Sequence, residues 1–461
     1  MNFECSPQYV VSAPARLALP THWHCTFARS ETCDPSAPGL PDTTRRQRGA
    51  PEIPLSCFVR TTLYVLTLAL LVFAAAPGQQ ARAQTSPAAL EATPEKRAAP
   101  AVPDLTWRPA EHVWFRPGGV LQIRYTFNHR RELSGETANT SRFSVPRARF
   151  ILDGGLTDYL SFRVRVGVLS GGNARFEQAY ADAKLTEQLT LRAGILYLNA
   201  SIGDAPAPQD AQAIDYSQYG LQTSGGNAAA AGARATFDRV RAQAFFSNGL
   251  RTAFSEFAAP IDARLAVTGR VEGRLFTKDG FSRFETESSF RGSDLGLRVG
   301  AAAHYQQGRV DGTLPHGDLQ QYTADVTLEG SGFNVIVAGR FLRVHPQAGN
   351  TTHDPGLLAQ AGVFVHERVE LWTRYDALYS DGQVHSFPDD RDGLHDHYQA
   401  IGGGINGYLL PRTNIAKVQA DFTYALDSIS STWAEASDNA ATLQTQREGQ
   451  WALRTQLMLS Y

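Results

Sequence analysis

Cysteines, long apolar runs and excess positive charge are all scarce in this chain, and each scarcity excludes a class of protein. The only cysteines are Cys5, Cys25, Cys33 and Cys57, and their spacings fit no CxxC or zinc-binding pattern. The formal net charge of −2 lacks the basic excess of a nucleic-acid-binding surface, so no nucleic-acid partner is expected. The one long apolar run, at 63–76, is shorter than the roughly 20 residues of a membrane-spanning helix.

The apolar run has the features of a secretory signal peptide. Arg60 precedes it, and the small-residue pattern Ala-Arg-Ala ends at Ala83. We therefore predict a signal peptide over 59–83, with cleavage after Ala83. Residues 1–58 do not suit the front of a signal peptide, and we expect that they are not translated from the true start; a cytoplasmic extension is the alternative. Export removes every cysteine from the mature chain.

The segment at 84–117 is expected to be a periplasmic linker. Its first twenty residues are rich in Ala and Pro, a composition that cannot build a core. Such a segment serves either as a tether to a periplasmic partner or as a disordered terminus. The folded domain is predicted over 118–461.

Strict alternation of apolar and polar residues dominates the chain from residue 118 onward. Leu121, Ile123 and Tyr125 alternate with Gln122 and Arg124, for example, and similar patterns continue to the last residue. A period of two indicates strands with one apolar and one polar face, and no segment competes as a long helix.

The lengths of the connections distinguish a membrane barrel from a soluble sandwich. Tight turns and long loops alternate along the chain, as in outer-membrane barrels with short turns facing the periplasm. Two connections depart from this rule: 169–174 is short and 276–294 is long. We predict an all-β fold, a transmembrane antiparallel β-barrel of about 16 strands in the bacterial outer membrane. The predicted strands are 118–128, 142–156, 160–168, 175–185, 189–198, 228–237, 240–247, 263–275, 295–305, 320–328, 333–343, 357–365, 369–379, 398–408, 414–426 and 450–461.

Several strand motifs occur in an order and spacing similar to those of the phosphate-selective porin O and P family. They are the segments at 147–156 (RARFILDGGL), 178–185 (QAY to Leu185), 191–194 (LRAG), 245–249, 371–376, 402–408 and 417–424. The resemblance implies an outer-membrane channel embedded in lipid and lipopolysaccharide, with small anions or phosphate as permeants and a homotrimeric assembly. After Gly194 the family commonly continues Gln-x-Lys-x-Pro, whereas this chain has an apolar stretch at 195–198, so general anion preference is implied more strongly than phosphate selectivity.

If the apolar face of each strand contacts lipid, the polar face lines a lumen in which basic residues outnumber acidic ones. A lumen lined with charges of one sign concentrates ions of the opposite charge. The acidic residues assigned inward are Asp153, Asp182, Glu272, Asp325, Glu370, Asp376 and Asp421. The pore-lining residues expected to attract anions are Arg124, Arg147, Arg149, Arg163, Arg165, Arg192, Arg264, Arg270, Arg274, Arg374 and Lys417, with Lys184, Arg234, Arg241, Arg298, Arg340 and Arg454 also assigned inward.

The long loop at 199–227 follows the fifth predicted strand and is a candidate constriction loop. It carries Asp204, Asp210 and Asp215 and no basic residue. Folded inward, it would place these acids opposite arginines of the wall; alternatively, it stays outside the barrel as a solvated loop.

No catalytic or metal-binding pattern is evident. The acidic and histidine-rich loop at 380–397 lacks the spacing of a calcium loop, and no Ser-His-Asp or HExxH arrangement occurs. We therefore expect a channel without enzymatic activity, metal or cofactor. A non-conducting barrel that serves as a surface adhesin or structural anchor is the alternative, and a barrel-embedded hydrolase is a further one.

Overall fold

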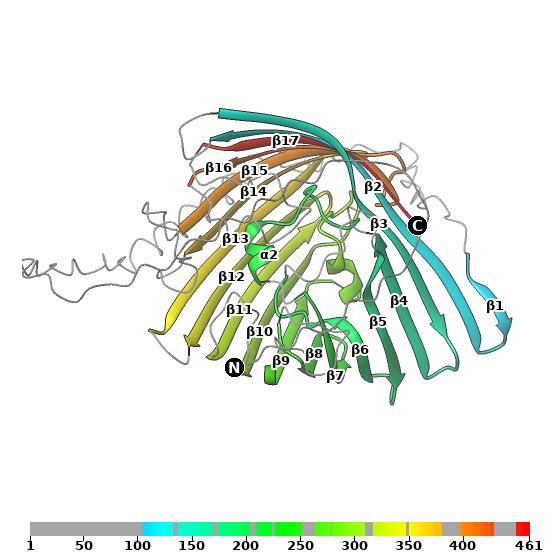
Figure 1. Cartoon of the computed structure of the whole chain (residues 1–461). Helices are drawn as coiled ribbons and strands as arrows, with labels where there is room; N and C mark the ends of the chain where they lie inside the picture. The colour runs from blue at the N-terminus through cyan, green and yellow to red at the C-terminus, as the bar shows by residue number, and fades with distance from the viewer. Residues whose placement is uncertain are drawn as a thin grey trace, which may run out of the picture. The chain divides into compact units, whose positions relative to one another are not determined.

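Sixteen antiparallel strands form a closed barrel in the computed structural model (Figure 1). The structure describes residues 105–461 apart from 132–136, 169–173, 203–208, 224–225, 251–262, 278, 309–316, 347–349, 380–396 and 428–448. The barrel strands are β2 (Val113–Arg131), β3 (Thr137–Gly155), β4 (Leu160–Val168), β5 (Ala174–Lys184), β6 (Leu189–Tyr197), β7 (Asn227–Thr236), β8 (Val240–Ser247), β9 (Ala263–Leu275), β10 (Gly296–Gly308), β11 (Gly317–Gly330), β12 (Phe333–Pro346), β13 (Thr352–His366), β14 (Val369–Tyr379), β15 (His397–Tyr408), β16 (Ala416–Ala425) and β17 (Trp451–Ser460).

The last strand closes the barrel against the first. β17 pairs with β2 from Trp451 opposite His129 to Ser460 opposite Val120, and every other barrel strand pairs with its neighbour in the sequence. Beyond β17, Tyr461 and Gly119 exchange two backbone hydrogen bonds of 3.1 Å. Closure leaves no free sheet edge in the barrel, as a lipid environment requires. The predicted barrel of sixteen strands is confirmed.

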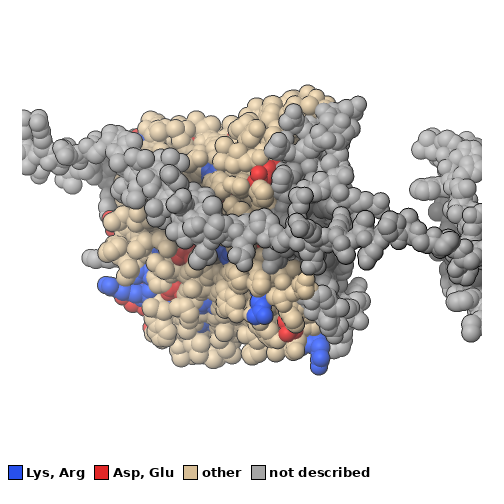
Figure 2. Space-filling model, turned by 90° about the vertical axis from the view of Figure 1, so that its left-hand side faces the viewer, with Lys and Arg blue, Asp and Glu red and all other residues tan. Residues whose placement is uncertain are grey.

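The two faces of the strands have opposite character. Leu121 and Ile123 of β2 are exposed on the outside (37% and 41%), whereas Gln122 and Arg124 are buried inside (0% and 2%). Uncharged residues cover most of the described strand surface seen in Figure 2. An apolar exterior and polar interior reverse the arrangement of a soluble protein and match a barrel surrounded by lipid. No helix within the described ranges is both long and apolar enough to cross a membrane.

Short turns lie on one rim of the barrel, here called the turn rim. The turns after β3, β5, β7, β11, β13 and β15 contain between two and seven residues. Two of them share a local cause: the side-chain oxygens of Thr157 and Thr186 each accept hydrogen bonds from the backbone N–H groups two and three residues later. Such turns form from local sequence alone. In outer-membrane barrels this rim faces the periplasm.

The connection between β9 and β10 is the exception on the turn rim. It spans 276–295 and contains the short 3₁₀ helix η2 (Phe281–Glu285). The predicted strands on either side of it are confirmed, so its length is a real feature of the chain and not a misplaced strand. The other connection that departed from the rule, at 169–173, lies outside the described residues.

Strand structure begins earlier than the expected barrel start at residue 118. β1 (Trp107–Ala110) forms a hairpin with β2, which itself starts at Val113. The rings of Trp107 and Phe115 stack at 5.5 Å across this hairpin, which holds β1 against β2. Residues 107–117 of the predicted linker therefore belong to the hairpin of β1 and β2. The predicted leader, the signal peptide and residues 84–104 of the linker lie outside the described residues.

Candidate functional site: the lumen and its inserted loop

The described part of the long segment between β6 and β7 occupies the barrel interior. Its helix α2 (Gln218–Thr223) lies inside the ring of strands and contacts β13 and β14 (Figure 1). Ser217 accepts a hydrogen bond from Gly220 N at 2.8 Å at the start of this helix. We call residues 198–226 the inserted loop. Of its three acidic residues, Asp210 and Asp215 lie in the lumen, and Asp204 lies outside the described residues.

Asp215 fastens the inserted loop to a group of wall arginines. Its carboxylate accepts hydrogen bonds from Arg124 at 2.7 and 3.0 Å and from Arg454 at 3.1 Å, and Arg147 is 3.8 Å away. Burial alone would raise the pKa of Asp215, but the positive charges of Arg124, Arg454 and Arg147 outweigh burial and hold the pKa below its ordinary value of 3.8. Asp215 is therefore ionised and neutralised by direct ion pairs.

A second attachment lies at Gln212, three residues before Asp215. The side chain of Gln212 donates to Asn334 and Glu370 at 2.7 and 2.6 Å, and its backbone carbonyl accepts from Asn406 and Gln419 at 3.0 Å each. These partners come from β12, β14, β15 and β16, all remote from the inserted loop in sequence. Because every partner is buried and polar, the loop has one well-defined position against this wall.

Three of the residues expected to line the pore contact this loop directly. Arg124 binds the Asp215 carboxylate, Arg374 donates to the Asp215 carbonyl at 2.9 Å, and Lys417 donates to the Ala211 carbonyl at 2.6 Å. All three face the lumen, as expected, and all are buried. Their charges hold the loop in place, which sequence alternation alone did not predict.

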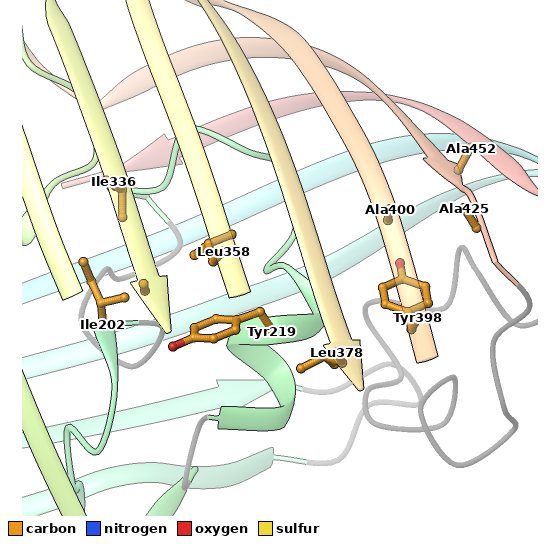
Figure 3. Close-up of a cluster of buried hydrophobic side chains, with 10 residues drawn as sticks. Ile202, Tyr219, Ile336, Leu358, Leu378, Tyr398, Ala400, Ala425 and Ala452 are labelled. Atoms are coloured by element: carbon orange, nitrogen blue, oxygen red, sulfur yellow. The ribbon is translucent and has the colours of Figure 1, made fainter. Parts of the chain in front are cut away.

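Apolar packing reinforces the attachment. Tyr219 of α2 and Ile202 pack with Ile336, Leu358 and Leu378, which project inward from β12, β13 and β14 (Figure 3). Tyr219 and Leu378 are fully buried. The inner wall is thus apolar where the loop covers it, whereas alternation predicted a polar inner face throughout.

The opposite wall carries a continuous group of arginines. We call Arg147, Arg149, Arg163, Arg165, Arg192, Arg234 and Arg241, on strands β3, β4, β6, β7 and β8, the arginine wall. Several of its members pair with carboxylates: Arg163 with Asp153 at 2.6 Å and Arg192 with Asp182 at 2.7 Å. Within the described ranges, Arg165 and Arg234 form no ion pair, and each has an Nε atom without a hydrogen-bond partner.

Tyrosines accompany the arginine wall. The guanidinium of Arg192 lies 4.1 Å from the ring centroid of Tyr180, and that of Arg147 lies 5.3 Å from the ring of Tyr216 in the inserted loop. Burial raises the pKa of Tyr216 to about 12, so its phenol is neutral at physiological pH. The inserted loop therefore presents the neutral side chain of Tyr216 toward the arginine wall, and its Asp215 carboxylate lies 3.8 Å from Arg147 of that wall.

The remaining expected pore-lining residues lie on β9. Arg270 pairs with Asp325 at 2.8 Å and Glu272 at 3.1 Å, and Arg274 pairs with Asp238 at 2.9 Å. Arg264 is exposed near the end of β9 that is remote from the turn rim. The charge of Arg270 is thus compensated within the wall, and that of Arg274 is paired with an exposed residue of the turn after β7.

Alternation failed to find one acidic residue of the wall, Glu177. A β-bulge in β5 shifts the pairing with β4, so that Arg165 lies opposite Gln178 and Val166 opposite Phe176. The bulge turns the extra residue, Glu177, into the lumen beside Gln178, where it lies 2.7 Å from Arg149. Glu329 and Asp354 are further buried acidic residues that the inward assignment missed.

Metal ligands do not gather in the part of the chain that the structure describes, since no three His, Cys, Asp or Glu side chains cluster there. The acidic residues of the loop at 380–396 lie outside the described residues.

A sixteen-stranded antiparallel barrel with an apolar exterior, a charged interior and an inserted loop is the architecture of an outer-membrane porin. The chain belongs to the phosphate-selective porin O and P family, which matches residues 119–371. Its place is the bacterial outer membrane. No curated protein sequence matches this chain.

Solved structures share the fold at low sequence identity. OmpF of Salmonella typhi, solved in complex with daunomycin, is 11% identical, with a TM-score of 0.52 over 77% of this chain and 100% of that one. The outer-membrane channel DcaP of Acinetobacter baumannii is also 11% identical, with a TM-score of 0.50 over 77% of this chain and 99% of that one. At this identity the likeness establishes the fold alone.

Proposed function

We propose that this porin passes small hydrophilic solutes by passive diffusion and prefers anions. The observation that carries the proposal is the arginine wall, in particular Arg165 and Arg234, which form no direct ion pair with a carboxylate in the described ranges. A low-dielectric wall lined with positive charge concentrates anions at the passage, and rings of arginine are a usual means of anion selectivity.

General anions are favoured over phosphate alone. Arginine presents the planar, bidentate geometry that suits both phosphate and carboxylate oxygens. The stretch after Gly194, however, contributes no basic residue: Leu196 and Leu198 are buried in an apolar cluster with Phe245 and Leu342. Phosphate is therefore one permeant among several in this proposal.

Reversal-potential measurements in planar bilayers test the proposal. In a KCl gradient across purified protein, an anion-preferring channel makes the dilute side negative at zero current. Addition of phosphate should reduce the chloride current if phosphate enters the same passage. A cation-selective channel would overturn the assignment of the arginine wall.

One observation favours an alternative, a non-conducting barrel that acts as a surface adhesin or anchor. The inserted loop and the connection at 276–295 both occupy the lumen. Absence of any conductance from folded protein would support that alternative. The family and fold point to a channel rather than an enzyme. Homotrimer formation and contact with lipopolysaccharide stay predictions, which native mass measurement in detergent and lipid co-purification test.

A further inference from the structure

The connection at 276–295 folds into the barrel from the turn rim instead of forming a tight turn. Phe281 and Phe284 of η2 are buried (6% and 3%). Arg241 lies 4.9 Å from the ring of Phe281, and Arg298 lies 5.7 Å from the ring of Phe284. The two aromatic side chains thus anchor the start of the connection among arginines of the inner wall.

The rest of the connection crosses to strands on the far side of β10. Ser288 donates to Glu370 at 3.1 Å and shares a 2.7 Å hydrogen bond with the hydroxyl of Tyr408. Arg291 donates to the carbonyl oxygen of Phe364 at 2.6 Å. These contacts join the connection to β13, β14 and β15, so it is fixed at both ends.

Between these ends the connection meets the inserted loop. The backbone N–H of Gln212 donates to the Glu287 carboxylate at 2.8 Å, and the backbone N–H of Glu287 donates to the Asp210 carbonyl at 2.8 Å. Gln360 of β13 donates to the same oxygen of Glu287 at 2.9 Å. Asn414, in the turn after β15, donates to the side chain of Asp210 at 3.2 Å. A loop from one rim and a connection from the other therefore bind each other within the lumen.

We propose that the connection at 276–295 positions the inserted loop, with Glu287 as the positioning residue, and thereby sets the cross-section left to solutes. Asp215 holds the loop on the wall arginines, and Asp210 to Gln212, three to five residues earlier, hold it on Glu287, in addition to the wall contacts of Gln212 and Lys417 described above. These fixed points leave Tyr216 at a defined distance from Arg147. The inference about cross-section rests on the proposed channel function; the positioning itself does not.

Glu287 suits this role because its carboxylate accepts hydrogen bonds from Gln212 of the inserted loop and from Gln360 of β13. It therefore joins the connection to both the loop and the wall. Charge-assisted bonds of this kind are about twice as strong as neutral ones. Lys417, which binds the inserted loop, lies among the carboxylates of Glu370, Asp210 and Glu287 and supplies compensating positive charge. Removing the Glu287 side chain leaves the buried N–H of Gln212 without its partner.

The test uses the substitution Ala213→Cys as a reporter in the full-length protein. Ala213 is buried (3%) and lies between the two attachment points. Labelling by a membrane-impermeant maleimide is read at residue 213 by peptide mass spectrometry, so the native cysteines, all before residue 60, do not contribute. Glu287→Ala should speed labelling by about tenfold, as expected for loss of charge-assisted hydrogen bonds, and should raise single-channel conductance. Glu287→Gln, which keeps an acceptor oxygen, should give a smaller effect and serves if the alanine variant does not fold.

Glu187→Ala is the matched control, because Glu187 is an exposed acid in the turn between β5 and β6. It should leave both readouts unchanged. Folded Glu287→Ala and Glu287→Gln proteins that label and conduct like the reporter background would overturn the positioning role. If no variant conducts, including the parent protein, the channel proposal fails, while the labelling rates still decide whether Glu287 positions the loop.

Discussion

Substituting Asp215 by alanine should loosen the inserted loop and strengthen anion preference together. The Asp215 carboxylate is nearly inaccessible and neutralises Arg124 and Arg454 directly, with Arg147 at 3.8 Å. Its loss removes one of the loop's attachments and leaves positive charge in the lumen without this carboxylate's compensation. Both effects arise from a single carboxylate, so they should appear together.

The size of the effect follows from the partners that remain. Removing one member of a buried ion pair costs about 3–5 kcal/mol. Arg454 keeps two hydrogen bonds to Asp421 at 2.7 and 3.0 Å, and Arg124 keeps Gln456 at 3.1 Å, so the lower end of that range applies. About 3 kcal/mol corresponds to a change of roughly a hundredfold in the ratio of docked to undocked loop.

Single-channel recording is the assay. Asp215→Ala should show frequent excursions to a larger conductance and a reversal potential shifted further toward chloride. Asp182→Ala is the control, since Asp182 compensates Arg192 on the wall at 2.7 Å and has no described contact with the loop. It should shift the reversal potential without the excursions. Current from Asp215→Ala that is as steady and selective as that of the parent protein would refute the anchoring role.

Three further outcomes are expected. Because the pKa of Asp215 is lowered in the folded protein, its stabilising contribution is complete above the ordinary value of 3.8 and is lost as pH falls through the lower folded pKa. The difference between the parent protein and Asp215→Asn in the frequency of conductance excursions should therefore stay constant from pH 7 to pH 4 and disappear only at more acidic pH. Gly194→Ala should destabilise the barrel by about 2 kcal/mol or more in urea unfolding, since φ is +135° and a Cβ would lie 2.2 Å from the backbone of β5, whereas Gly269→Ala, with no close neighbour, should have little effect. Ile401→Arg on the lipid face should cost about 2–4 kcal/mol in folding into lipid vesicles, and a negligible cost would contradict the outward placement.

The strand framework could be predicted because lipid imposes a simple rule on sequence. Each residue such as Leu121 that meets lipid must be apolar, and its neighbour Gln122 meets the lumen. The period of two therefore marked all sixteen strands. It failed at Glu177, because a bulge adds one residue to β5 and breaks the period locally.

The arrangement of the lumen could be predicted only in part. The inward direction of Arg124, Arg374 and Lys417 followed from alternation, but their contact with the inserted loop depends on pairing across many residues of sequence. No local pattern encodes the position of that loop. The inward fold of the connection at 276–295 was equally hidden; only its unusual length indicated that it was not an ordinary turn.

The most direct test of the account compares reversal potentials of the parent protein and of the double variant Arg165→Gln, Arg234→Gln in the same KCl gradient. These two arginines of the arginine wall form no direct ion pair within the described ranges. We expect an anion-selective parent protein and a double variant whose reversal potential moves clearly toward zero at unchanged conductance. A cation-selective parent protein, or a double variant as anion-selective as the parent, would contradict this expectation.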